Sequence, residues 1–266
     1  MKILLPPSET KRSGGEGFLR PAELRAHEQL HHARGRVRAA LEELSRGDED
    51  IAAKALKLGV KNRDELQHNL RLDESGVLPA VERYTGVLYD ALDVPSLNAA
   101  ERAWLAEHVL VQSALLGLVG AGDRIPAYRL SAGSRLPGLG APLKRVWSEA
   151  HANIEWAGAG LVLDLRSKDY AALAPLPNDV GYALLVVQRG DDGAVRALNH
   201  FNKAAKGDLV RRLARSAARL DTPQQLLDWA QVTGLELSLD ESSRVITLVT
   251  ELGAPAARSS AHSTAR

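Results

Sequence analysis

The stretch Val195-Arg-Ala-Leu-Asn-His-Phe-Asn-Lys-Ala-Ala-Lys-Gly-Asp-Leu-Val-Arg211 changes from an apolar run into a basic helix, and the rest of the chain can be arranged around it. Asp191-Asp-Gly193 is a hairpin turn signal, so we expect 182–188 and 195–201 to form paired strands. From Asn202 onward, apolar residues recur with the period of a helix. The stretch therefore predicts a strand that leads directly into an amphipathic helix.

The first turn of that helix carries Lys203 and Lys206 beside backbone N–H groups that a helix start leaves unpaired. Cations and free N–H groups together favour a phosphate or a carboxylate. Lys206 adjoins the apolar face, where its charge needs a partner or a route to water. Gly207 stands mid-helix against propensity, which indicates close approach of another backbone or a ligand. With Arg211 these residues form a predicted anion or DNA site, and a helix with a solvated basic face is the alternative.

Composition limits the classes of protein that the chain can belong to. At 45% hydrophobic, the 266 residues can bury a core. There is no cysteine, which excludes disulfides, disulfide-linked partners, thiolate metal sites and thiol catalysis. No stretch approaches the roughly 18 apolar residues of a membrane span, and the start is too short for a signal peptide, so we expect a cytoplasmic protein without a membrane partner. The formal net charge of +1 restricts any DNA interface to a local patch.

The N-terminal segment combines a short strand with a loop of mixed polar residues. Lys2–Leu5 predicts a buried strand, and residues 8–17 after it are polar and rich in glycine. Glycines let backbone amides approach a ligand, and Ser8, Thr10 and Lys11 could add donors to an anion cradle. Their spacing is not that of a Walker motif, so a plain surface connection is the alternative.

The remaining pattern mixes helices and strands. We expect helices at 21–46, 78–90, 99–107, 143–156, 168–173 and 222–231, and strands at 109–116, 161–165, 235–239 and 245–249. His27 and His31 share a helix face, but two histidines without carboxylate ligands are a poor metal site, so we expect neither metal nor cofactor. The pattern predicts a single α+β (mixed α/β) domain with a mixed sheet over 1–253, and a disordered tail at 254–266.

Residues 48–72 form a predicted helical appendage to this domain, with two short helices joined at Leu58-Gly-Val-Lys-Asn62. This resembles a helix-hairpin-helix, in which a glycine-containing hairpin offers backbone amides to DNA phosphates. Lys57, Lys61 and Arg63 would add positive charge there. An ordinary helical hairpin fits the same pattern.

Short motifs recur in order along the whole chain. They are Leu4-Leu-Pro-Pro-Ser-Glu-Thr-Lys11, Gly86-x-x-Tyr89, Ser113…Gly117…Asp123, Tyr128-Arg-Leu130 with Gly133, Trp147, Leu165-x-Ser167-x-x-Tyr170, Lys203-x-Ala-Lys-Gly207 with Arg211, and Asp240-x-Ser-Ser243. Together they resemble the YaaA family of bacterial proteins, also known as the DUF328 or UPF0246 family. The resemblance implies a cytosolic protein of the hydrogen peroxide response with a mixed α/β fold, a helix-hairpin-helix, double-stranded DNA binding along a basic cleft, and an indirect effect on free iron.

Two classes of function stay open. A DNA-associated stress protein would place on phosphates Lys57, Lys61, Arg63, Lys203, Lys206 and Arg211. An enzyme or binding protein for a small anionic ligand would use residues with the chemical variety of a pocket, namely Ser8, Thr10, Lys11, Asp123, Tyr128, Arg129, Ser167 and Tyr170. Convergence of Ser8–Lys11, Arg129 and Lys203–Gly207 on one place favours the ligand, whereas cations spread along an open face favour DNA.

Overall fold

The computed structural model describes residues 1–189, 195–197 and 202–250. In this part of the chain, eight strands form one mixed sheet in the order β4-β3-β1-β6-β7-β10-β9, with β8 paired to β7. Their bounds are β1 Lys2–Leu5, β3 Val109–Ser113, β4 Gly117–Gly120, β6 Val162–Asp164, β7 Tyr182–Arg189, β8 Val195–Ala197, β9 Glu236–Asp240 and β10 Val245–Thr250. A two-stranded sheet joins β2 (Leu78–Pro79) to β5 (Arg124–Ile125). The predicted mixed α/β class is confirmed.

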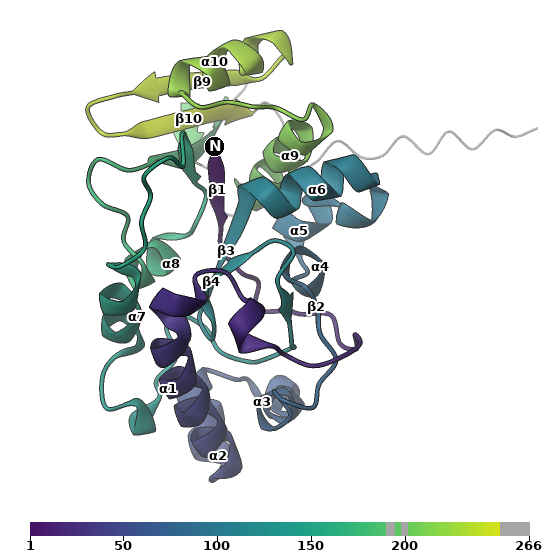
Figure 1. The fold of residues 1–266 in the computed structure, drawn as a ribbon, viewed down its shortest axis with the longest axis vertical. Coiled ribbons are helices and arrows are strands. Elements are labelled where there is room, and N and C mark those ends of the chain that lie inside the picture. Colours follow the sequence, from purple (N-terminus) through teal and green to yellow (C-terminus); the bar gives the residue numbers. More distant parts are fainter. Residues whose placement is uncertain (190–194, 198–201, 251–266) are drawn as a thin grey trace, which may run out of the picture.

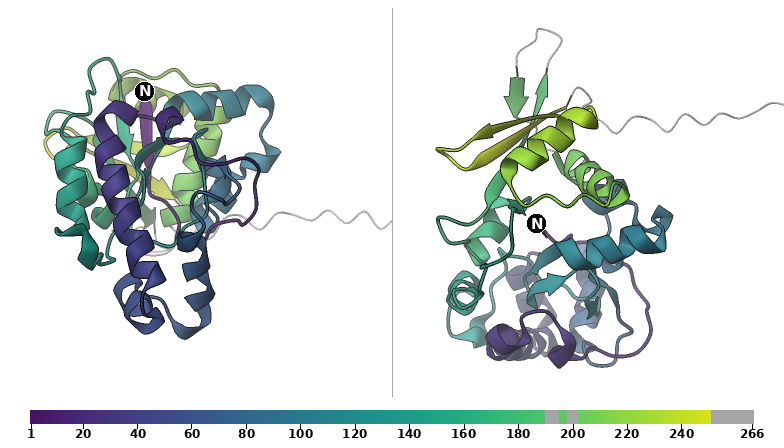
Figure 2. Two further views of the ribbon diagram at one scale, coloured as in Figure 1. Left: turned by 60° about the horizontal axis from the view of Figure 1, so that its bottom comes forward. Right: turned by 45° about the horizontal axis from the view of Figure 1, so that its top comes forward.

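Helices cover both faces of the large sheet (Figures 1 and 2). One face carries α1 (His27–Arg46), α7 (Leu143–His151) and α8 (Lys168–Leu173). On this face α7 contacts both α1 and α8. The other carries α5 (Val87–Leu92), α6 (Ala99–His108) and α9 (Asn202–Arg215), and α10 (Pro223–Val232) packs on β9. The shorter helices are α2 Glu49–Leu56, α3 Leu66–Leu70 and α4 Ala80–Arg83, with 3-10 helices η1 Pro21–Glu23, η2 Val60–Glu65, η3 Val94–Ser96 and η4 Pro137–Leu139.

The strand order reverses at β1. The strands β3, β1, β6 and β7 are parallel, so their carboxyl ends meet at one edge of the sheet. The chain leaves β1 for β3 on one side and later returns with β6 on the other. In open sheets of this type, ligands bind outside the carboxyl ends of the strands at such a switch point. Two loops meet there, 6–17 after β1 and 165–167 after β6, where Leu165 N donates to Leu4 O over 2.9 Å.

The predicted strand and helix around residue 202 are confirmed in the described residues. The helix begins at Asn202, as predicted, and β8 forms the start of the expected second strand, whereas 198–201 lie outside the described residues. Gly207 packs on α5, because a Cβ atom there would overlap Leu88 O and lie 2.9 Å from Ala91 Cβ. The close approach that Gly207 indicated is therefore made by the backbone of a second helix.

Several elements end earlier than the periodicity predicted. The expected helix 21–46 is interrupted at Ala26, which has a φ of 52°, and the expected helix 143–156 ends at His151. The expected helix 78–90 breaks before Gly86, which has a φ of 95°. The expected strand 109–116 ends at Ser113, because the Ser113 hydroxyl accepts the N–H groups of Leu115 and Leu116 and turns the chain into β4.

The segment 48–72 folds as α2, η2 and α3, with the first turn of α2 closed by the Asp48 carboxylate, which accepts Ile51 N over 2.9 Å. Whether this arrangement acts as a helix-hairpin-helix stays a prediction. The expected tail at 254–266 lies outside the described residues.

Candidate ligand site at the carboxyl edge of the sheet

Lys11 is held by its own loop and by aromatic rings. Its Nζ donates to Ser8 O over 3.0 Å and to Glu9 O over 3.1 Å. The same atom lies 4.2 Å from the centre of the Tyr128 ring and 5.5 Å from that of the Tyr84 ring. Burial, followed by the charge of Arg129, lowers the pKa of Lys11 to about 7. Burial thus opposes the charged form of Lys11, whereas the faces of the two rings favour it.

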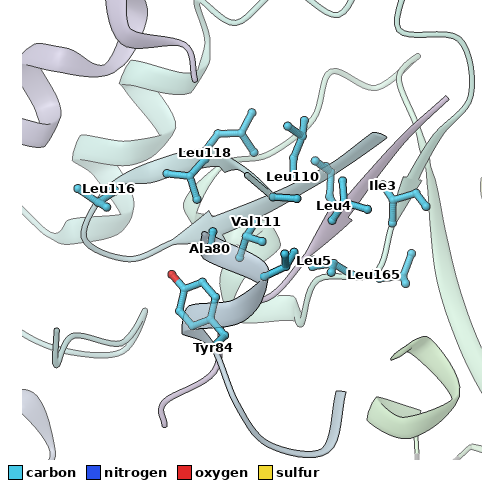
Figure 3. Packing of buried hydrophobic residues seen from close by; sticks show 14 of the residues in the cluster. Ile3, Leu4, Leu5, Ala80, Tyr84, Leu110, Val111, Leu116, Leu118 and Leu165 are labelled. Atoms are coloured by element: carbon cyan, nitrogen blue, oxygen red, sulfur yellow. The ribbon is translucent and has the colours of Figure 1, made fainter. Parts of the chain in front are cut away.

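Four of the five tyrosines of the chain lie in this region: Tyr84 and Tyr128 face the amine, Tyr89 lies beside Tyr84, and Tyr170 interacts with Tyr128. The rings of Tyr84 and Tyr89 are 5.4 Å apart, and those of Tyr84 and Tyr128 are 6.5 Å apart. Burial raises the pKa of all four phenols, so they stay neutral hydrogen-bond donors. Figure 3 shows Tyr84 beside Ala80, at the end of the apolar cluster that includes Leu5. With Lys11 and Arg129, these tyrosines are named the Lys11 cluster below.

The hydroxyl groups of the cluster form a directed chain of hydrogen bonds. Ser113 Oγ already accepts two backbone N–H groups, so its own hydrogen is donated to Tyr128 Oη over 2.7 Å. Tyr128 in turn donates to Tyr84 Oη over 2.8 Å. The hydroxyl hydrogen of Tyr84 is therefore not used in this series of hydrogen bonds.

Arg129 is buried and held by carboxylates from two segments. Its backbone N–H and carbonyl oxygen both bond to the Asn69 side chain, at 2.7 and 3.0 Å. Its guanidinium pairs with Glu65 at 3.1 Å and with Glu9 at 3.2 Å. The Arg129 side chain is 7% exposed, whereas that of Glu9 is 67% exposed. Among the described residues Arg129 Nε has no hydrogen-bond partner, so this arginine retains donor capacity for another acceptor.

Hydroxyl groups from two segments meet beside the cluster. Thr85 Oγ1 donates to Thr10 Oγ1 over 3.0 Å, and Thr10 Oγ1 lies 3.2 Å from Ser8 Oγ. A Cβ on Gly86 would lie 3.4 Å from Ser8 Oγ, so a side chain there would reduce the space beside these hydroxyls. The loop residues Ser8, Thr10 and Lys11 are thus brought together with Tyr128 and Arg129, whereas the expected convergence of Lys203–Gly207 on the same place stays a prediction.

Two residues of the predicted pocket have other surroundings. The carboxylate of Asp123 accepts Arg25 N over 2.7 Å and Gly120 N over 3.0 Å, which closes the turn after β4. Ser167 is exposed at the start of α8, and its hydroxyl makes no capping hydrogen bond to that helix. In the structure Asp123 thus closes a turn, Ser167 is exposed at the sheet edge, and a ligand contact by either residue stays a prediction.

Three of the six predicted phosphate-binding cations, Arg63, Lys206 and Arg211, have partners within the described residues. Lys206 Nζ donates to Leu165 O over 2.9 Å, and burial lowers its pKa. Arg211 donates to Leu92 O and Asp93 O, both over 3.0 Å, at the end of α5. Arg63 lies 2.6 Å from Asp50 and 3.6 Å from Glu49. Lys57, Lys61 and Lys203 are exposed.

The described residues hold no group of three or more His, Asp or Glu side chains placed to bind a metal ion. His27 and His31 stack 5.3 Å apart, and the Nδ1 atom of each contacts a backbone carbonyl.

None of the helices within the described ranges is long and apolar enough to cross a membrane. A cavity of about 530 Å³ lies at the opposite, amino edge of the sheet, lined by residues such as Trp156, Gly181 and Asp221, and it contains none of the predicted site residues.

Four residues at the site were not among the predicted site residues: Tyr84 and Tyr89 of the Lys11 cluster, and Glu9 and Glu65, which pair with Arg129. Glu9 lies within the quoted motif Leu4–Lys11. Tyr89 lies in one of the quoted motifs, Gly86-x-x-Tyr89, which could have identified it as a candidate site residue. Tyr84 carried no such signal, because its segment was expected to be the interior of a helix.

The fold and the cluster together define an α/β protein with a polar cluster, centred on a lysine and an arginine, at the switch point of a mixed sheet. Residues 1–241 match the family described as peroxide stress protein YaaA. A UPF0246 protein of Streptomyces coelicolor is 40% identical over 246 residues, which is 92% of this chain and 94% of the relative. One of Corynebacterium efficiens is 38% identical over 253 residues, 94% of this chain and 100% of the relative. The chain therefore belongs to the YaaA family.

The pKa of Lys11 predicts a pH dependence of stability. Below pH 7 both folded and unfolded chains bind the proton, and the folded state bears the full cost of burying the charge. As the pH rises from 7 towards the unfolded pKa of about 10.4, the folded protein loses the proton first and that cost falls. Wild type should thus gain about 2 kcal/mol of unfolding free energy relative to Lys11→Met between pH 7 and 9. Urea denaturation over this range measures the gain.

The exposed Lys144 provides the matched control. Wild type and Lys144→Met should keep a constant difference in unfolding free energy over the same range. A constant difference for Lys11→Met as well would show that Lys11 is not buried as described.

Proposed function

We propose that the protein serves the response to peroxide stress by binding a small anionic ligand at the Lys11 cluster. The observation that carries this proposal is Arg129, a buried guanidinium that is already paired with two carboxylates, one of them on an exposed side chain. An arginine matches the planar geometry of carboxylate and phosphate groups. Glu9 occupies the position that a ligand anion would take, and its loop can release it at low cost, because the side chain is 67% exposed.

The distribution of charge favours a ligand over a nucleic acid as the main partner. Of the six predicted phosphate-binding cations, Arg63, Lys206 and Arg211 are engaged by carboxylates or backbone carbonyls, which leaves them less available to nucleic-acid phosphates. Neutral, buried tyrosines supply shape and directed hydrogen bonds, which a charge patch for DNA does not require. The location at the switch point of the sheet supports the same class of function.

Removal of the competing carboxylate should strengthen anion binding. Glu9→Gln is expected to bind inorganic phosphate about tenfold more tightly than wild type, because the ligand no longer displaces a charge-assisted hydrogen bond worth about 1.5–3 kcal/mol. Isothermal titration calorimetry gives the two dissociation constants, and thermal shift at fixed phosphate gives an independent ranking.

The control is Glu23→Gln, which removes an exposed carboxylate that pairs with Arg20 over 2.9 Å outside the cluster. It should leave phosphate affinity unchanged. Equal affinities for wild type, Glu9→Gln and Glu23→Gln, or no stabilisation of wild type by phosphate, would contradict the proposed site.

A second candidate function, double-stranded DNA binding by the hairpin, is favoured by one local observation. Lys57 and Lys61 are exposed on either side of Gly59, and a Cβ on Gly59 would meet no atom within 4 Å. The backbone of this turn is therefore open to a phosphate, with two cations beside it.

Lys57→Glu combined with Lys61→Glu should weaken DNA binding uniformly across sequences, because phosphate contacts carry no base information. The slope of log affinity against log salt should become shallower by about 0.9 for each phosphate that the variant no longer neutralises. Fluorescence anisotropy over a salt series measures both quantities.

The control pair, Lys144→Glu with Lys168→Glu, changes the net charge equally at exposed positions on α7 and α8. Equal effects of the two pairs would remove the hairpin from the proposal.

A further inference from the structure

The amine of Lys11 is held in one orientation by hydrogen bonds to its own loop. Two backbone carbonyls, those of Ser8 and Glu9, accept two of its N–H groups. A neutral amine has two hydrogens and one lone pair, so this arrangement uses both hydrogens and directs the lone pair to the remaining tetrahedral position. The loop thus fixes the orientation of the lone pair on Nζ.

Glu9 links the amine to the anion site. Its carbonyl oxygen accepts from Lys11 Nζ over 3.1 Å, while its carboxylate lies 3.2 Å from Arg129 Nη2. A ligand carboxylate that replaces the carboxylate of Glu9 would therefore be bound within one residue's length of the amine.

We propose that Lys11 is a reactive amine that forms a Schiff base with a small 2-oxo acid, whose carboxylate is taken by Arg129. This inference rests on the anion site proposed above and names its class of substrate. The structure already shows carboxylates as the partners of Arg129, which favours an oxo acid over a phosphorylated aldehyde.

The chemical step balances without a further reactant. The lone pair of Nζ adds to the carbonyl carbon, and the carbonyl electron pair moves to oxygen, which takes up a proton. Both amine hydrogens finally leave with that oxygen as water, and nitrogen forms a double bond to carbon. No oxidation or reduction occurs. The lowered pKa of Lys11 supports this role, because only the neutral amine is a nucleophile.

Neutral phenols can hold the protons that move in these steps. Tyr84 ends the hydrogen-bonded chain with a hydrogen to donate, and its ring centre lies 5.5 Å from Nζ. Tyr128 lies closer, at 4.2 Å, but its hydrogen is already donated to Tyr84. Tyr84, rather than Tyr128, is therefore the phenol with a hydrogen left to donate.

Reductive trapping tests the proposal on the full chain. Glyoxylate serves as the probe oxo acid, and sodium cyanoborohydride at pH 7.5 converts any Schiff base into a stable carboxymethyl-lysine. Peptide mass spectrometry then compares the nine lysines of the chain. An exposed lysine with a pKa near 10.4 is only about 0.1% neutral at this pH, so Lys11 should be labelled about tenfold or more faster than Lys144. Tyr84→Phe should slow labelling of Lys11 and leave that of Lys144 unchanged.

Arg129→Lys tests the recognition of the carboxylate. It should reduce labelling of Lys11 by glyoxylate more than labelling by propanal, which has no carboxylate. Equal reduction for both aldehydes would overturn the assignment of an oxo acid. Labelling of Lys11 no faster than that of Lys144 would overturn the reactive amine.

Phosphate binding separates this inference from the proposed function. Lys11→Arg keeps a positive charge but cannot form a Schiff base under these conditions, so it should still be stabilised by phosphate. If phosphate stabilises wild type while glyoxylate leaves Lys11 unlabelled, the Schiff base is wrong and the anion site stands. If neither effect is seen, both proposals are wrong.

Discussion

Gly207→Ala is expected to lower the free energy of unfolding by about 3 kcal/mol, because packing extra atoms into a filled interface costs about 1–3 kcal/mol and occasionally more. Helix propensity alone predicts the opposite sign, since alanine in a helix interior is favoured over glycine by about 1 kcal/mol. The overlap decides the outcome here. A Cβ on Gly207 would overlap Leu88 O and lie 3.0 Å from Leu92 N, and backbone atoms of α5 cannot move aside as a side chain can.

Gly35→Ala is the matched control for this prediction. Gly35 is exposed inside α1, and a Cβ there would meet no atom within 4 Å. This change should therefore raise the free energy of unfolding by about 0.4–1 kcal/mol. Urea denaturation of both variants gives the two signs. Stabilisation by Gly207→Ala would show that α5 and α9 are not packed as closely as described.

Gly207 also illustrates how far sequence reasoning extends. A glycine inside a helical pattern predicted a close approach, and the structure confirms it, but the pattern contained no information on the partner. The partner is α5, which lies far away in sequence and whose own limits were mispredicted, because the expected helix 78–90 breaks before Gly86. Local periodicity identifies faces and ends of elements, whereas the pairing of faces depends on the whole fold.

Some residues of the candidate site could likewise be predicted from the sequence, and others could not. Ser8, Lys11 and Tyr170 follow parallel strands, so residues chosen for their chemistry were brought together by the shared carboxyl edge. Glu9, in a loop, and Glu65, at the end of η2, were not predicted, because a charged side chain in a polar segment looks solvated until its partner is known.

The predicted cations show the same limit. Arg63 was chosen as a charge beside the glycine-containing hairpin and Arg211 as part of the basic helix, and their role as phosphate ligands stays a prediction. In the structure Arg63 pairs with Asp50, and Arg211 donates to carbonyls at the end of α5. Periodicity places a charge on a helix face, but only the tertiary structure shows which acceptors stand opposite.

Arg83→Met is expected to cost about 4 kcal/mol of unfolding free energy, because it leaves four backbone carbonyls without their donor at about 1 kcal/mol or more each. Arg83 is 0% exposed. Its guanidinium donates to Ile125 O over 3.0 Å, Gly14 O over 3.0 Å, Gly76 O over 2.7 Å and also to Arg12 O. Methionine fills the volume of the arginine stem but supplies no donor.

The destabilisation should extend to the candidate site, because Arg12 and Gly14 closely follow Lys11 in the loop that Arg83 holds. Amide hydrogen exchange in 12–17 should accelerate more in Arg83→Met than that of β10. Arg102→Met is the control, since Arg102 also bonds a carbonyl and a carboxylate but is 39% exposed, so its removal should cost about 1 kcal/mol or less. If the two variants unfold at the same urea concentration, Arg83 does not anchor the loop, and the orientation of Lys11 must be maintained by other interactions.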